Sequence, residues 1–187
     1  MLPKIDVSKT RIETDRLILR PFTQNDLNDF FAYASVPGVG EMAGWPHHET
    51  IETSQKILNM FMEEKNVLAI FHKESGRVIG SFGFHDSWAN YDDRYKDKRL
   101  SEIGYVLSKE FWGQGLMPEA VKAALEYGFT VMNLEIIGVC HFAANHQSRR
   151  VIEKSGFTPV STGVFHAKQL GRDIEEIRYL MERPGNV

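Results

Sequence analysis

One stretch of the sequence, residues 102–142, limits the choice of folds more than any other. It begins with an apolar run at 102–107, which is typical of a strand, and a turn with two glycines follows at 112–117. A helix is expected from Pro118, because proline suits the first helical position and apolar residues then recur at helical spacing. A second apolar run at 134–142 predicts another strand. This strand–helix–strand crossover indicates an α/β chain.

The remaining sequence predicts one domain with the element order β-α-α-β-β-β-α-β-α-β-β. No repeat or linker divides the 187 residues, so we expect a single domain over 1–187 with its core at about 12–182. Helices are expected after Thr23, from about Thr50, and from Asn145 to Ser155, where Gly156 would end the last one. The expected strands are 16–22, 67–71, 77–84, 102–107, 134–142, 157–168 and 174–182. The order favours a largely antiparallel sheet.

The charge balance and the hydropathy pattern argue against several function classes. The 22 basic and 25 acidic residues give a net charge of −3, whereas a nucleic-acid binder usually has a basic field. No apolar run approaches the roughly 20 residues that span a bilayer. The first ten residues hold no apolar signal-peptide core. We therefore expect a cytoplasmic protein that binds neither nucleic acid nor membrane.

The glycine turn at 112–117 is suited to binding an anion through its backbone. Glycines let the chain approach a ligand closely, and the following helix N-terminus offers free amides and partial positive charge. The turn lacks the lysine and Ser/Thr of a P-loop and the third glycine of a dinucleotide fingerprint. Taken alone, the turn also fits a tight connection without a ligand, or a nucleotide-binding protein.

Four segments in order along the chain resemble one family. They are TDRLILRP at 14–21, GWP at 44–46, EIGYVL with EFWGQGLMPEA at 102–107 and 110–120, and NHQSRRVIEKSGF at 145–157. Together they are similar to the acetyl-CoA signatures of the GNAT superfamily of acetyltransferases. The closest branch contains the ribosomal-protein N-terminal acetyltransferases, and the resemblance covers about 12–182. Trp112 and Met117 depart from the wider superfamily pattern, but both occur in that branch.

The resemblance implies a twisted mixed sheet of about seven strands flanked by about four helices, with a V-shaped cleft between the fourth and fifth strands. Acetyl-CoA would lie in that cleft as co-substrate. The implied coenzyme-binding residues are Tyr105, Val106 and Leu107 for the pantetheine, Trp112, Gly113, Gln114, Gly115, Leu116 and Met117 for the pyrophosphate, and Asn145, Ser148 and Arg150 on the next helix. The Trp112 side chain is expected to pack rather than to react.

Acetyl transfer to an amine needs a base for the ammonium proton and a donor for the leaving thiolate. Glu102 is the candidate base, because it begins the strand expected to line the cleft, and His85 is its rival. The resemblance gives Ser148 the position near the coenzyme sulfur. Asn145 is counted with the catalytic residues, although it is equally readable as a helix N-cap. No histidines form a metal-ligand pattern, so no metal is expected.

Direct transfer in a ternary complex is expected rather than a covalent acetyl-enzyme. The one cysteine, Cys140, lies in an apolar run and is expected to be a buried strand residue. The expected acceptor is a protein N-terminus, whose α-amino pKa near 8 eases deprotonation relative to lysine. A polyamine, an aminoglycoside-like amine, a protein lysine and a non-catalytic coenzyme A sensor remain open, as does a homodimer. Acceptor contacts are expected from the loops 36–48 and 86–99 and the last hairpin.

Overall fold

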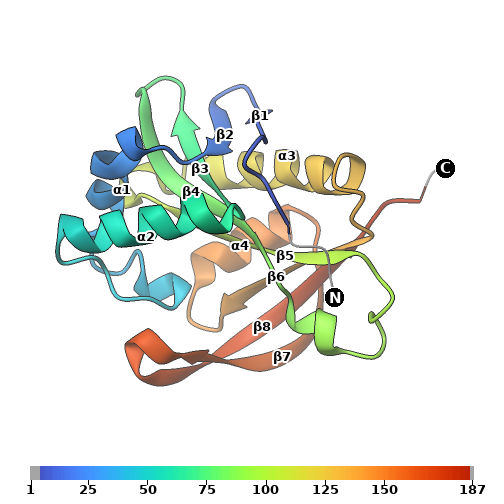
Figure 1. Cartoon of the computed structure of the whole chain (residues 1–187). Coiled ribbons are helices and arrows are strands. Elements are labelled where there is room, and N and C mark those ends of the chain that lie inside the picture. Colours follow the sequence, from blue (N-terminus) through green and yellow to red (C-terminus); the bar gives the residue numbers. More distant parts are fainter. Residues whose placement is uncertain (1–4, 186–187) are drawn as a thin grey trace.

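One mixed sheet of eight strands runs through the computed structural model, which describes residues 5–185 (Figure 1). Its strands, in spatial order, are β1 (Ile12–Glu13), β2 (Leu17–Pro21), β3 (Val67–His72), β4 (Arg77–His85), β5 (Leu100–Leu107), β6 (Ile136–Phe142), β8 (Arg172–Glu182) and β7 (Thr158–Ala167). The four α-helices of the described residues are α1 (Leu27–Ala34), α2 (Ile51–Glu64), α3 (Leu116–Thr130) and α4 (His146–Lys154). The predicted α/β fold with a mostly antiparallel sheet is confirmed. The extra strand, β1, is only two residues long.

The parallel pair of the sheet, β5 and β6, is joined by the crossover helix α3. Pairing between these two strands covers Leu100–Ile103 on β5 and Ile136–Val139 on β6. Beyond Ile103, β5 keeps its antiparallel partner β4 as far as Leu107 but has no register with β6. The two strands therefore diverge. They are the fourth and fifth strands predicted from the sequence, so the predicted cleft lies between β5 and β6.

The helices cover opposite faces of the sheet with separate apolar cores. On one face, Phe30 and Tyr33 of α1 and Leu58 of α2 pack with Ala69 and Val78 from the strands. On the other face, α3 and α4 cover a larger core that includes Phe82 and Ile103. The helical periodicity expected after Pro118 is confirmed, because Val121, Ala124, Leu125, Gly128 and Phe129 are all buried.

Helix α3 begins at Leu116, two residues earlier than proline suggested. Gly115 occupies the N-cap with φ of 76°, a left-handed conformation that glycine adopts without strain. Pro118 then stands in the first turn, where its missing N–H still removes no helical hydrogen bond. The glycine turn and the helix start are therefore one continuous unit.

The two expected loops contain short ordered turns. A 3₁₀ turn at Glu41–Ala43 lies within the 36–48 loop, and another at Trp88–Tyr91 lies within the 86–99 connection. Trp88 packs edge-on against Tyr95, with ring centroids 6.3 Å apart, so the second loop is not simply an exposed polar segment. No helix within 5–185 is long and apolar enough to cross a membrane.

Candidate active site

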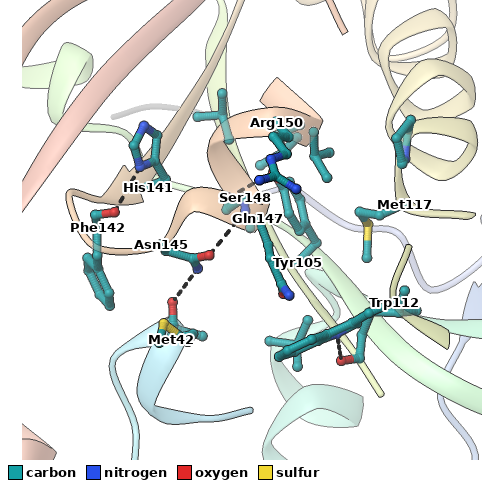
Figure 2. Close-up of a pocket in the computed structure, with 18 of the residues that line it drawn as sticks. Met42, Tyr105, Trp112, Met117, His141, Phe142, Asn145, Gln147, Ser148 and Arg150 are labelled. Atoms are coloured by element: carbon teal, nitrogen blue, oxygen red, sulfur yellow. Dashed lines mark hydrogen bonds between the residues drawn. The ribbon is translucent and has the colours of Figure 1, made fainter. Parts of the chain in front are cut away.

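A cavity of about 480 Å³ lies where β5 and β6 diverge (Figure 2). Its walls come from both strands, the glycine turn, α4, the 36–48 loop and the β7–β8 hairpin. Of the coenzyme-binding and catalytic residues expected from the sequence, the lining includes Glu102, Tyr105, Val106, Leu107, Trp112, Gly113, Gly115, Leu116, Met117, Asn145, Ser148 and Arg150. Segments far apart in the sequence therefore meet at one site.

The half of β5 that lacks a β6 partner forms one wall of this cavity. Residues 104–107 pair with β4 on one side only, and Tyr105, Val106 and Leu107 all line the cavity. A strand edge without a neighbouring strand can accept an extended ligand through main-chain hydrogen bonds. The amides of a pantetheine chain fit this edge.

The glycine turn forms a second wall, and its backbone can receive an anion. Gly113 and Gly115 both have φ of 76°, and a Cβ placed on Gly113 would meet no atom within 4 Å. Within residues 5–185, the amides of Gly113, Gln114 and Gly115 donate no hydrogen bond. Free amides beside open space at a helix N-terminus fit a pyrophosphate.

Two side chains of the turn have structural partners. The indole N–H of Trp112 donates to the Leu107 carbonyl at 2.8 Å, which fixes the turn against the end of β5 (Figure 2). The Gln114 side chain donates to the Glu110 carbonyl at 3.0 Å and does not contribute to the cavity wall. Any role of Gln114 in binding would therefore be played by its backbone.

Helix α4 brings the expected Asn145, Ser148 and Arg150 to the cavity. The Asn145 side chain caps the helix, because its Oδ1 accepts the Ser148 amide at 3.1 Å. Its Nδ2 donates to the Met42 carbonyl at 3.3 Å, which links α4 to the 36–48 loop (Figure 2). The neighbouring Arg149 pairs with Glu153 on the helix surface and does not line the cavity. The structure thus gives Asn145 a capping role.

The side chains of Tyr105 and Ser148 point toward one another in the wall of the cavity (Figure 2). Their hydroxyl oxygens are 3.0 Å apart. Burial raises the pKa of the Tyr105 phenol far above its usual range, so the phenol stays protonated and can donate to Ser148. Ser148 is then free to donate its own proton into the cavity, as a leaving thiolate requires. Sequence reasoning missed this use of the Tyr105 side chain.

Replacing Ser148 by alanine is expected to lower kcat by about 10² if its hydroxyl assists thiolate departure. Tyr105→Phe should reduce kcat less, because the serine hydroxyl remains. Ser155→Ala is a matched control on the end of the same helix, where Ser155 Oγ donates to the Val151 carbonyl. Steady-state kinetics with saturating acetyl-CoA would measure the effect. Equal kcat for Ser148→Ala and Ser155→Ala would remove Ser148 from the chemistry.

Glu102 lies half-buried at the inner end of the cavity. One of its oxygens accepts a hydrogen bond from Ser87 Oγ at 2.9 Å. Burial raises the pKa of Glu102, and the nearby Glu176 adds to this, whereas the hydrogen bonds of Ser87 and Cys140 oppose it. A carboxyl group with a raised pKa can take a proton at neutral pH more readily than an ordinary glutamate.

The rival base His85 stands directly opposite Glu102 in the β4–β5 register. Its ring leans over Gly83 and Gly104, since a Cβ on either glycine would contact it. The side chain is exposed and does not line the cavity. This geometry favours Glu102 over His85.

A second carboxylate, Glu176 of β8, also lines the cavity and was missed by sequence reasoning. It is 7% exposed, and its Oε1 accepts a hydrogen bond from Arg178 Nε at 2.8 Å. The Arg178 guanidinium also lies 5.1 Å from the centre of the Trp88 ring. Alternation along β8, with both residues on one face, was the signal that could have pointed to this pair.

Cys140 is the residue whose expected setting was wrong. It lies in β6 as predicted, but its side chain is half-buried and faces the cavity instead of the apolar core. The first four residues of β6 are all buried, and burial alternates only from Val139 onward. The pairing with β5 ends at Val139, and this leaves Cys140 on the open side. Burial, together with the charges of Glu102 and Glu176, raises the pKa of the thiol far above its usual range.

A thiol that stays protonated is a poor nucleophile. Cys140→Ala is therefore expected to leave kcat largely intact, measured by thiol release from acetyl-CoA. A correctly folded Cys140→Ala enzyme without any activity would instead support a covalent acetyl-enzyme.

The diverging strands and the glycine turn together fit an enzyme whose co-substrate is a long, phosphate-bearing thioester. The family described as "Acetyltransferase (GNAT) domain" matches residues 16–158 of the sequence, and the chain belongs to this family. It is an acetyl-CoA-dependent N-acetyltransferase. Residues 5–185 contain no group of three or more His, Cys, Asp or Glu side chains that could hold a metal ion.

Three similar proteins frame this assignment. The uncharacterised N-acetyltransferase YoaA of Bacillus subtilis is 32% identical over 151 residues, covering 78% of this chain and 81% of YoaA. The putative ribosomal N-acetyltransferase YdaF of the same organism is 37% identical over 59 residues, 32% of each chain. A spermidine N-acetyltransferase from Vibrio cholerae, solved with CoA and spermine, superposes with a TM-score of 0.71 at 19% identity, covering 90% of this chain and 96% of that one.

Proposed function

We propose that this N-acetyltransferase, acting as one domain over 1–187, transfers the acetyl group to a protein N-terminal α-amino group. The supporting observation is the charge of the cavity. Its charged lining residues within 5–185 are Glu102, Glu176, Arg150 and Lys154. Arg178 pairs with Glu176, which leaves Glu102 as the carboxylate facing the acceptor. One free carboxylate suits an acceptor with a single ammonium group.

The proposed reaction is a direct attack in a ternary complex. Glu102 would take the proton of the incoming ammonium, directly or through a water, and the free amine nitrogen would then form a bond to the acetyl carbon. As the carbon–sulfur bond breaks, the amide nitrogen would release its second proton and the departing thiolate would take up one proton in exchange. The Ser148 hydroxyl, held by the Tyr105 hydroxyl 3.0 Å away, would donate a hydrogen bond to the departing sulfur. An α-amino group, with a reference pKa near 8, gives up its proton more easily than a lysine near 10.4.

The rim of the cavity supports a peptide acceptor. Phe165 of β7 contacts Phe142 at a ring-centroid distance of 5.4 Å, and a Cβ on Gly44 would collide with the Phe165 ring. Met42 completes this rim and is 44% exposed. An apolar rim around a single carboxylate suits the first side chain of a peptide better than a linear polycation.

A polyamine is the competing acceptor, because the V. cholerae neighbour is a spermidine N-acetyltransferase and two carboxylates line the cavity here. Thiol release from acetyl-CoA, screened over N-terminal peptides, lysine peptides, polyamines and aminoglycosides, separates the classes. We expect release with peptides that have a free α-amine and none with the same peptides blocked at the N-terminus. Release with spermidine but not with peptides would overturn the proposed acceptor.

A further inference from the structure

The opening motif at 14–21 meets the glycine-turn motif at a single carboxylate, that of Glu119. Glu119 lies in the first turn of α3, and Figure 1 shows the β1–β2 segment lying beside this helix. One carboxylate oxygen accepts the Thr14 hydroxyl at 2.6 Å and the Arg16 amide at 3.0 Å. The other accepts Arg16 Nε at 2.7 Å. Residues about a hundred positions apart are thus joined by one dense set of hydrogen bonds.

Arg16 also reaches the turn itself. Its NH1 group donates to the Gln114 carbonyl at 2.9 Å, between Gly113 and Gly115, which both line the cavity. This bond holds the Gln114 peptide in one orientation, with its carbonyl turned toward Arg16. The adjacent Gly113 and Gly115 are otherwise the most adaptable residues of the turn, so an external anchor at Gln114 limits their freedom.

The charge of Glu119 makes this anchor necessary for anion binding. A carboxylate at a helix N-terminus is favourable by itself, but here its negative charge would repel the phosphates that the nearby amides of the glycine turn would bind. The hydrogen bonds from Thr14 and Arg16 outweigh the effect of burial and lower the pKa of Glu119, so the group is ionised. The Arg16 guanidinium, 2.6 Å away, neutralises it.

We propose that Arg16 is a positioning residue for the pyrophosphate of acetyl-CoA, which rests on the assignment of the glycine turn as the pyrophosphate site. Arg16 fixes the turn through Gln114 and cancels the charge of Glu119, and it does both without contact with the acetyl group. The role predicts weaker binding of ligands that contain the pyrophosphate and little change for those that lack it.

The variant Arg16→Met tests the role in the full-length protein. Calorimetric titration with CoA should give a Kd about 10-fold to 100-fold higher than that of the wild type. Arg11→Met is the matched control, because it removes an arginine that is paired with Glu13 on the same segment. That variant should bind CoA like the wild type. A Kd for Arg16→Met equal to that of Arg11→Met would overturn the proposal.

Two further measurements separate positioning from general damage. S-acetylpantetheine has the thioester but no pyrophosphate, so Arg16→Met should lower kcat/KM for acetyl-CoA about 10-fold more than for this fragment. Equal losses with both donors would refute the role. The double variant Arg16→Met, Glu119→Gln should recover part of the CoA affinity, and no recovery would overturn the charge-neutralising part.

The failure of the underlying site assignment would look different. If the wild-type protein bound CoA and S-acetylpantetheine with the same Kd, the pyrophosphate would make no contact, and both the site and the role of Arg16 would be wrong. If the wild type bound CoA more tightly than S-acetylpantetheine, and Arg16→Met showed the same ratio of the two Kd values, the pyrophosphate site would be supported. Only the role of Arg16 would then be wrong.

Discussion

Glu102→Gln is expected to reduce kcat by about 10² to 10³ at pH 7, because a positioned general base contributes on this scale. The glutamine keeps the size of the side chain and can still accept from Ser87 Oγ, which is 2.9 Å from the carboxylate, so the fold should be preserved. Steady-state turnover against the best acceptor would measure the loss. Unchanged turnover across the pH range would remove Glu102 from the mechanism and return His85 or a water chain to consideration.

The pH profile gives a sharper test of the same residue. The base form of Glu102 is lost as pH falls through its raised pKa, so the acidic limb of kcat/KM should lie above that of an ordinary glutamate. Ser87→Ala removes a hydrogen bond to the charged form and should move the limb to higher pH. Glu176→Gln removes a neighbouring negative charge and should move it to lower pH. Shifts in the same direction would contradict the assignment.

Phe82→Ala is expected to have the largest effect on stability, a loss of about 3–5 kcal/mol in the free energy of unfolding. Phe82 of β4 is fully buried and stacks on Tyr105 at a ring-centroid distance of 6.2 Å. Its removal leaves a cavity beside Tyr105 of β5, the strand that lines the active site. Urea denaturation would measure the change.

Phe82→Leu is the matched control and should cost less than the alanine variant, because it keeps most of the buried volume. If both variants unfolded at the same urea concentration, the surrounding core would have to close around the missing ring. That result would show that the stability of the fold does not depend on the Phe82 ring, which stacks on Tyr105 from the neighbouring strand.

The fold was predictable from sequence where local chemistry decides the structure. Asn145 caps α4 by accepting the Ser148 amide, as its side chain predicted. Helix α2 starts directly after Thr50, as expected, and Thr50 caps it by accepting the Thr53 amide. Strand β1 was not predicted, because two residues are too few to show a strand periodicity. Ile12 belongs to a strand only because it pairs with Leu19. The early start of α3 depends on the left-handed Gly115, which proline statistics do not encode.

The parts of the candidate site that lie within sequence motifs were predictable, whereas the residues brought to it by pairing between strands were not. The positions on β5 and in the glycine turn were expected from the resemblance that their motifs carry, and all of them except Gln114 line the cavity. Glu176 lines the cavity, with its partner Arg178 beside it, because β8 pairs with β6, so that Cys140 lies opposite Arg178 and Phe142 opposite Glu176. That pairing is tertiary, and the charged alternation on β8 is equally typical of a solvent-facing strand. The half-buried setting of Cys140 was missed for the same reason.

The short pairing between β5 and β6 has a mechanical consequence. The sheet has two parts: strands β1 to β5, and strands β6, β8 and β7. Within the sheet formed by residues 5–185, the two parts are joined only by four residue pairs, at Leu100–Ile103 of β5. A coenzyme bound between the two parts of the sheet would contact both of them. Separating the two parts during unfolding would then also require release of the coenzyme. Acetyl-CoA at about 100 times its Kd would then stabilise the whole protein by about 2.7 kcal/mol. The co-substrate would then stabilise the folded protein in addition to serving as a reactant.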